Sequence, residues 1–208
     1  MTTSPKEAVL DAFLRLVGEK GYAEVTLRDV AAAAGLGLAE LYRLYPDKVA
    51  LVSAFMARID AEVLAGTPTG VDPEETARDR LFDVMMRRYD ALKSHRQALH
   101  TVRRAATRDP LLALAIGPAL RRSMALMLEA ASLSSDGLRG ALRQNGLMAI
   151  HHAVWRVFDQ DETADLSKTM AALDSRLKTA ERWSQILERN ARSRRPEPPS
   201  GEPNTVTE

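Results

Sequence analysis

Residues 35–48, GLGLAELYRLYPDK, decide the fold of the N-terminal part of this chain. Gly35 predicts the end of one short helix, because glycine readily adopts the left-handed backbone that follows a helix. A second short helix is expected at about residues 38–44, and Pro46 ends it. Asp47 can then cap a longer helix that reaches about residue 65. The segment therefore predicts two short helices joined by a tight turn, followed by a long one.

The helix before Gly35 is expected to begin after Thr26. Thr26 is a good N-cap residue, and Asp29 three positions later predicts a capping box with a short arm. Small residues at 31–34 let two helices cross closely, and Leu36 and Leu41 are expected to fill the space between them. A pair of this spacing is the helix-turn-helix that reads DNA, although any short helix pair in an all-α protein can share the spacing.

The composition favours helix and excludes several kinds of site. Of the 208 residues only 5% are aromatic, and there is no cysteine, so disulfides, thiolate metal sites and a cysteine nucleophile are excluded. The N-terminus lacks the pattern of a signal peptide, so we expect a cytoplasmic protein. The formal net charge of +1 argues neither for nor against binding to nucleic acid.

Helical periodicity continues to about residue 192, with no strand pattern. We predict an all-α fold, with an N-terminal three-helix helix-turn-helix head on a larger helical body. The expected boundaries are residues 1–50 for the head, 51–192 for the body, and 193–208 for a disordered tail rich in proline and glutamate. Besides the helices already named, we expect helices at about 5–19, 73–93, 95–107, 110–131, 135–158 and 166–192.

The stretch TLRDVAAAAGLGLAELYRLYPDKVALV, residues 26–52, resembles the head of TetR-family transcriptional regulators. The shared features are the threonine cap, the alanine-rich step before the glycine, the tyrosines and lysine of the second helix, and an aliphatic start to the next helix. The resemblance spans roughly residues 5–60. It implies a homodimer whose head binds a palindromic operator on double-stranded DNA. It also implies a body that holds a ligand pocket and the dimer interface.

The resemblance also implies DNA-binding residues, position by position. Tyr42 and Lys48 would contact phosphates, together with the cap region around Thr26, while the start of the second helix would lie near base edges. The predicted set is Thr26, Arg28, Leu38, Ala39, Glu40, Tyr42, Arg43, Tyr45 and Lys48.

Three positions depart from the family pattern. Gly37 replaces the usual hydroxyl residue at the helix cap, Leu38 replaces a polar side chain, and Glu40 replaces a small hydroxyl residue. Residues 1–50 also hold six basic and seven acidic side chains, a net charge of −1 that suits phosphate poorly. Glu40 either accepts a hydrogen bond from a cytosine N4 or is simply solvated.

A second resemblance concerns residues 161–183, DETADLSKTMAALDSRLKTAERW. This segment is similar to the C-terminal helix of ubiquinone-biosynthesis lipid-binding proteins that carry a TetR-like fold. It implies an alternative function, that of a lipid- or quinone-binding accessory protein whose head no longer binds DNA.

The body is rich in methionine, which is flexible and often lines adaptable pockets. With the family resemblance, this predicts a pocket for a hydrophobic or amphipathic small molecule; the alternative is that the same side chains only fill the core. The predicted pocket residues are Phe82, Met85, Met86, Tyr89, Met124, Met127, Met148 and Trp155.

The helices expected at about 135–158 and 166–192 are candidates for the homodimer interface. The first offers the small-residue face Leu142, Gly146, Ala149 and Ala153. The second offers a stripe at helical spacing. Two helices from each subunit would form a four-helix interface. The stripe consists of Leu166, Met170, Leu173, Leu177 and Ala180.

The remaining polar side chains suggest no chemistry. His151 and His152 point about 100° apart on a helix, so we expect a core or dimer role and no metal site. No catalytic arrangement is recognisable, so we expect neither an enzyme nor a cofactor. A basic region is read as a solvated face balanced by aspartates; contact with an anionic headgroup or a membrane is the less favoured interpretation. It comprises Arg87, Arg88, Lys93, Arg96, Arg103, Arg104 and Arg108.

Overall fold

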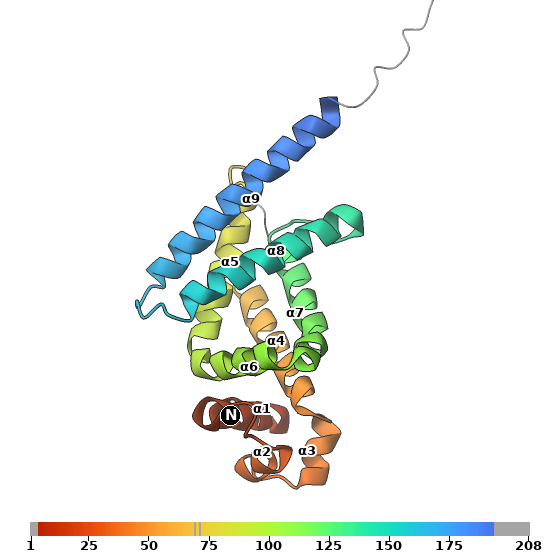
Figure 1. The fold of residues 1–208 in the computed structure, drawn as a ribbon, viewed down its shortest axis with the longest axis vertical. Coiled ribbons are helices and arrows are strands. Elements are labelled where there is room, and N and C mark those ends of the chain that lie inside the picture. Colours follow the sequence, from red (N-terminus) through yellow and green to blue (C-terminus); the bar gives the residue numbers. More distant parts are fainter. Residues whose placement is uncertain (1–3, 69, 71, 194–208) are drawn as a thin grey trace, which may run out of the picture.

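The computed structural model describes residues 4–68, 70 and 72–193, and the side chains as far as residue 182. Within these residues the chain forms nine helices and no strand, which confirms the all-α prediction (Figure 1). The helices are α1 (Pro5–Lys20), α2 (Leu27–Ala33), α3 (Leu38–Leu44), α4 (Lys48–Ala65), α5 (Ala77–Lys93), α6 (Arg96–Arg108), α7 (Pro110–Ala130), α8 (Gly137–Phe158) and α9 (Ser167–Ser193).

The helices α1 to α3 form a small head at one end of the molecule (Figure 1). The apolar stripe of α1 is buried, as its helical spacing predicts, and Phe13 packs edge-on against Tyr22 at 6.4 Å between ring centroids. Val30 from α2 and Leu41 from α3 complete the interior, both with no exposed surface. One buried apolar side chain from each short helix thus joins the interior of the head, where α2 packs on α1 and α3 packs on α2.

The helix α4 is shared by the head and the body. Its N-cap is Asp47, whose carboxylate accepts a hydrogen bond from the Ala50 amide at 2.7 Å, as predicted. From there α4 runs out of the head and packs against α5 and α7 (Figure 1). Since α4 begins at Lys48, the boundary expected after residue 50 falls inside a continuous helix.

The body is built from α5 to α9. The helix α6 lies against α1 of the head, while α8 and α9 pack together at the far end (Figure 1). The helix α7 is long and apolar enough to cross a membrane by length and composition, with 28% of its most apolar window buried. Its C-terminal half packs in the core through Met124, Met127 and Leu128.

Three sequence expectations change or lie beyond the described residues. The helix expected from residue 73 begins instead at Ala77, because Thr76 provides the cap and accepts from the Asp79 amide at 3.2 Å. Of the predicted dimer stripe, Leu166, Leu173 and Leu177 are already buried in the same chain, while Met170 and Ala180 remain exposed. The expected tail at 193–208 lies, apart from the last residue of α9, outside the described residues.

Candidate functional site

The turn between α2 and α3 has the geometry expected of a helix-turn-helix. Gly35 has a backbone φ of +70°, the left-handed conformation that glycine adopts readily. The Leu36 amide then returns to the Ala31 carbonyl at 2.9 Å and closes the end of α2. At the other end of α2 the predicted capping box is present, with the Thr26 amide donating to the Asp29 carboxylate at 2.9 Å. Local hydrogen bonds therefore set both ends of this unit.

The helix α3 shows most of its surface to solvent. Leu41 is its one fully buried side chain among residues 38–44, and it anchors the helix on the head. The side chains of Leu38 and Tyr42, one turn apart, are 44% and 62% exposed. The predicted DNA-binding residues on the exposed surface of α3 are Leu38, Ala39, Glu40, Tyr42 and Arg43.

The predicted DNA-binding residues Thr26, Arg28 and Tyr45 lie outside α3 and differ in how far they are exposed. Thr26 and Arg28 are exposed on α2, although the Thr26 hydroxyl also serves the capping box. The hydroxyl of Tyr45 is 3.5 Å from the backbone carbonyl of Lys6, so this half-buried side chain also ties α1 to the end of α3. Its DNA contact stays a prediction.

Lys48 has a structural role that the sequence did not indicate. Its ammonium donates to the carbonyls of Tyr22 and Val25 at 2.8 and 2.9 Å, and it lies 4.4 Å from the centre of the Tyr22 ring. Partial burial lowers the pKa of this ammonium below its usual range. The first residue of α4 therefore clamps the loop that leads into α2. The phosphate contact predicted for Lys48 would have to use its remaining N–H.

The acidic side chains that give residues 1–50 a net charge of −1 lie mostly outside α3. The carboxylates of Asp29 and Asp47 cap helices, and Asp11 forms an ion pair with Arg58 at 2.5 Å. The Thr26 hydrogen bond holds the pKa of Asp29 below its ordinary value. Several acidic groups of the head are thus held by partners within the protein, away from α3.

On α3 itself the two charged side chains are Glu40 and Arg43. Both are exposed, and neither makes a hydrogen bond or ion pair with the described residues. The charges on this surface therefore balance and are free for a partner.

Residues 9–55 match the family model described as bacterial regulatory proteins, tetR family. The N-terminal head belongs to the TetR family. Comparison with curated proteins finds no match. The TetR-family head thus covers the helix-turn-helix and the first half of α4.

Solved structures extend the likeness to the whole fold. A TetR transcriptional regulator from Nitrosomonas europaea ATCC 19718 is 20% identical with a TM-score of 0.69, covering 85% of this chain and 97% of its own. A second, from Rhodococcus sp. RHA1, is 22% identical with a TM-score of 0.59 and covers 83% and 95%. The fatty acid degradation regulator FadR from Bacillus halodurans is 17% identical with a TM-score of 0.59 and covers 85% and 96%. The chain therefore has the fold of these TetR regulators over 83–85% of its length.

The predicted pocket residues all belong to the continuous apolar core. Met85, Tyr89, Met124 and Met127 have no exposed surface, while Phe82 and Met148 are partly buried. The structure thus brings these side chains into one interior, as expected of either a pocket or a packed core. The pocket itself stays a prediction.

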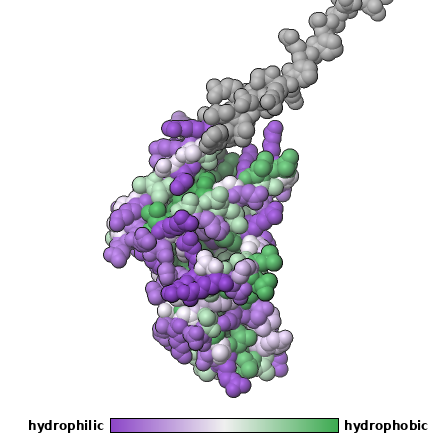
Figure 2. Space-filling view, viewed as in Figure 1, coloured by the Kyte–Doolittle hydropathy of each residue, from purple (hydrophilic) through white to green (hydrophobic). Residues whose placement is uncertain are grey.

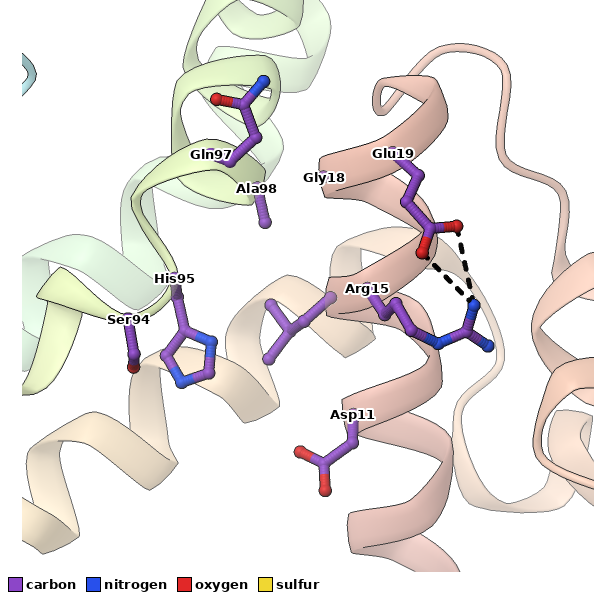
Figure 3. Close-up of a pocket in the computed structure, with 9 residues that line it drawn as sticks. Asp11, Arg15, Gly18, Glu19, Ser94, His95, Gln97 and Ala98 are labelled. Atoms are coloured by element: carbon purple, nitrogen blue, oxygen red, sulfur yellow. Dashed lines mark hydrogen bonds and ion pairs between the residues drawn. The ribbon is translucent and has the colours of Figure 1, made fainter.

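Two surface hollows lie elsewhere. One of about 530 Å³ lies between α1 and the start of α6, with His95 and Gln97 on the body side and Arg15 and Glu19 on the head side (Figure 3). A smaller one of about 90 Å³ lies between the start of α5 and the residues just after α4 and α7. No predicted pocket residue lines either of them. The larger hollow marks the joint between head and body.

The body contains a buried polar cluster that was not predicted from the sequence. The Arg88 guanidinium donates to the Asp60 carboxylate at 2.5 Å, and the Ser123 hydroxyl donates to the same oxygen at 2.5 Å. Arg88 is 2% exposed, so the expectation that it belongs to a solvated basic face is wrong. The signal was present, since Arg88 continues the helical stripe of Leu81, Met85 and Leu92.

A second buried pair lies beside the first. The hydroxyl of Tyr89 is 3.0 Å from Nδ1 of His151, and the two rings stack at 5.8 Å between centroids. Burial, the largest cause, and the charge of Arg88 place the pKa of His151 well below its ordinary value. His151 is therefore neutral, and of the two roles expected for it the structure shows the core role.

Proposed function

We propose that this protein is a cytoplasmic transcriptional regulator, not an enzyme, that binds double-stranded DNA through α3. The observation that carries the proposal is the arrangement of α3 on the head. Leu41 holds the helix from beneath, and five predicted DNA-binding side chains face solvent without partners in the described chain. A helix presented in this way fits the major groove. Leu38 then suits a thymine methyl, and Glu40 suits a cytosine N4 amine.

We propose that the active form is a homodimer joined through α8, with the outer surface of α9 beside it. Leu138 and Leu142 on α8 are 80% and 64% exposed, and the small residues Gly146 and Ala149 continue the same exposed surface. Apolar side chains this exposed on a helix favour a partner, and small residues permit close approach. Figure 2 shows apolar surface along the edge where α7 and α8 lie. A two-fold axis here would present two heads to a palindromic operator.

We propose that a ligand in the body controls the spacing of the two heads through α4. This helix has a polar anchor near each end. Lys48 clamps the loop before α2, and Asp60 holds Arg88 and Ser123 in the body core. The two anchors are separated by about 18 Å along one continuous helix. A ligand that prefers one position of α4 would shift the population of DNA-binding dimers by its differential affinity.

The experiment that tests DNA binding is selection from a random duplex library at about 0.15 M salt. We expect enrichment of a palindrome with half-sites about one helical turn apart. On the selected site, Arg43→Ala should cost about 1–3 kcal/mol and relax the preference at one base pair. Arg104→Ala on exposed α6 removes the same charge far from α3 and serves as the matched control.

The alternative function is that of a lipid- or quinone-binding accessory protein. Selection without enrichment, with only weak salt-sensitive retention of DNA, would favour this alternative. Mass spectrometry of protein purified without detergent would then be expected to find a bound prenyl or acyl lipid.

A further inference from the structure

Buried N–H donors without acceptors gather in the body core. Among the described residues, the buried side-chain atoms without a hydrogen-bond partner are Arg88 Nε, Trp155 Nε1, Arg96 Nε and Nη2, and the acceptor Asp159 Oδ1. Arg88 and Trp155 lie nearest the Tyr89–His151 pair, since Arg88 precedes Tyr89 on α5 and the Trp155 ring is 5.6 Å from the His151 ring between centroids. Arg88 and Trp155 are 2% and 7% exposed. Native interiors leave few buried donors unpaired, so two in one region need an explanation.

His151 adds a third donor to the same region. The Tyr89 hydroxyl and Nδ1 of His151 share a hydrogen bond, and we take the tautomer in which the hydroxyl donates and Nδ1 accepts. We assign the proton of the neutral imidazole to Nε2 on this basis. No described residue accepts a hydrogen bond from that Nε2–H.

These donors come from neighbouring side chains. The ring of Trp155, one turn from His151 on α8, lies 5.6 Å from the imidazole between centroids. The ring of Tyr89 stacks on the imidazole of His151. Arg88 directly precedes Tyr89 on α5. The missing partner is therefore rich in acceptors.

The charge of the region distinguishes between kinds of acceptor. The guanidinium of Arg88 uses Nη1 for Asp60 and leaves Nε–H free. After burial, interactions with Arg88, His152 and Arg103 lower the pKa of His151 further, the direction that a positive surrounding gives. A positive potential with unpaired donors suits a carboxylate better than a neutral carbonyl.

We propose that the body binds a small organic carboxylate whose oxygens accept from Arg88 Nε, Trp155 Nε1 and His151 Nε2. Its apolar part packs among the aromatic rings at this site, where Tyr89 and Phe158 lie 5.2 Å apart between centroids. The flexible methionines of α5 and α7 move to admit it. This inference rests on the proposed ligand-responsive function and names the chemistry of the ligand.

The same contact explains how a ligand bound in the body can affect the head. A carboxylate at Arg88 competes with Asp60 for the guanidinium. Asp60 lies on α4, whose first residue clamps the loop of the head. Weakening the Arg88–Asp60 pair therefore loosens the body end of α4.

The test is a titration of the full-length dimer carrying Trp183→Phe, which leaves Trp155 as the single indole. The probes are sodium carboxylates from butanoate to dodecanoate and phenylacetate, each beside the alcohol and the ammonium ion of the same carbon skeleton. At least one carboxylate should change the emission of Trp155 saturably. It should bind at least about tenfold more tightly than its alcohol, as expected for hydrogen bonds to a charged group. The ammonium ion should not bind.

Variants locate the binding. His151→Phe should weaken the best carboxylate by about tenfold, because it removes one donor and keeps a ring. His152→Phe changes the exposed neighbour and should leave binding unchanged. Trp155→Phe, measured by calorimetry, should weaken binding by a similar factor. Thermal unfolding of each variant shows that it folds.

The inference is overturned if no carboxylate binds more tightly than its alcohol, or if His151→Phe and Trp155→Phe bind like the parent. Enrichment of an operator would then leave DNA binding intact as the proposed function. Carboxylate binding that does not alter operator affinity would instead support this site and contradict control of the head by α4.

Discussion

Replacing Lys48 by methionine tests the clamp between α4 and the head. The methionine keeps the length of the side chain but removes the ammonium that donates to the Tyr22 and Val25 carbonyls at 2.8 and 2.9 Å. The two carbonyls then lose their donor. The head should become less stable even where no DNA is present.

The magnitude follows from the contacts. A buried hydrogen bond from a charged donor contributes about 1.5–3 kcal/mol, and because Lys48 is only partly buried, about 1–1.5 kcal/mol applies to each of the two bonds. Loss of the contact with the Tyr22 ring adds about 0.5–1 kcal/mol. We expect Lys48→Met to lower the free energy of unfolding by about 2–4 kcal/mol.

Urea unfolding at a fixed protein concentration measures this change, because the stability of the proposed dimer would depend on concentration. With an m-value of about 2–3 kcal/mol/M, the midpoint should fall by about 1 M. Lys20→Met, which removes an exposed lysine at the end of α1, should change stability by less than about 0.5 kcal/mol.

The opposite pattern would refute the clamp. If Lys48→Met unfolds at the midpoint of the parent protein but loses DNA affinity, Lys48 acts only as a phosphate contact. Loss of both would mean that the one side chain serves the fold and the DNA together.

Three further predictions concern the body and the caps. Asp60→Asn should lower the free energy of unfolding by about 3–5 kcal/mol, because it leaves the buried Arg88 charge unpaired; a thermal melt close to that of the parent protein would contradict the buried pair. Thr26→Ala should cost about 1 kcal/mol in urea unfolding. Thr26 holds the pKa of Asp29 below its ordinary value, so the difference in free energy of unfolding between the variant and the parent protein should depend on pH. The difference should be complete above about pH 4 and should shrink as the pH falls through the lowered pKa of Asp29. A difference that does not change with pH would argue against the capping box. Gly140→Ala should destabilise α8 by about 1–3 kcal/mol or more, since a Cβ there would lie 2.1 Å from the backbone of the preceding loop; unchanged melting would show that this loop can move freely.

Local sequence determined the elements that depend on neighbours in the chain. Thr26 and Asp29 specify the start of α2, and Gly35 ends it, because caps and turns form within a few residues. The exposed surface of α3 follows in the same way once Leu41 is recognised as its anchor. The helix-turn-helix, and its TetR character, could therefore be predicted from residues 26–52.

Helical periodicity also predicted which sides of the helices are apolar, but it cannot say what covers them. Leu173 and Leu177 of the α9 stripe were expected at the dimer interface and instead pack inside their own chain, while Met170 of the same stripe is 41% exposed. A stripe reports only that one side of a helix is buried. Whether the partner is the same chain or a second copy is a property of the tertiary structure.

Pairing between distant residues was decided only by the tertiary structure. Arg88 was assigned to a solvated face, yet it meets Asp60 in the core, 28 positions away, and its neighbour Tyr89 meets His151, 62 positions away. Lys48 likewise donates to carbonyls 23 and 26 positions away, so this contact could not be predicted from the sequence. Caps and turns depend on residues within a few positions of one another, whereas a buried charge is stable only beside a partner that the fold brings to it. The sequence alone thus determined the helix-turn-helix and the helical class, and the packing of α4, α5, α7 and α8 decided where the buried charges and unpaired donors lie.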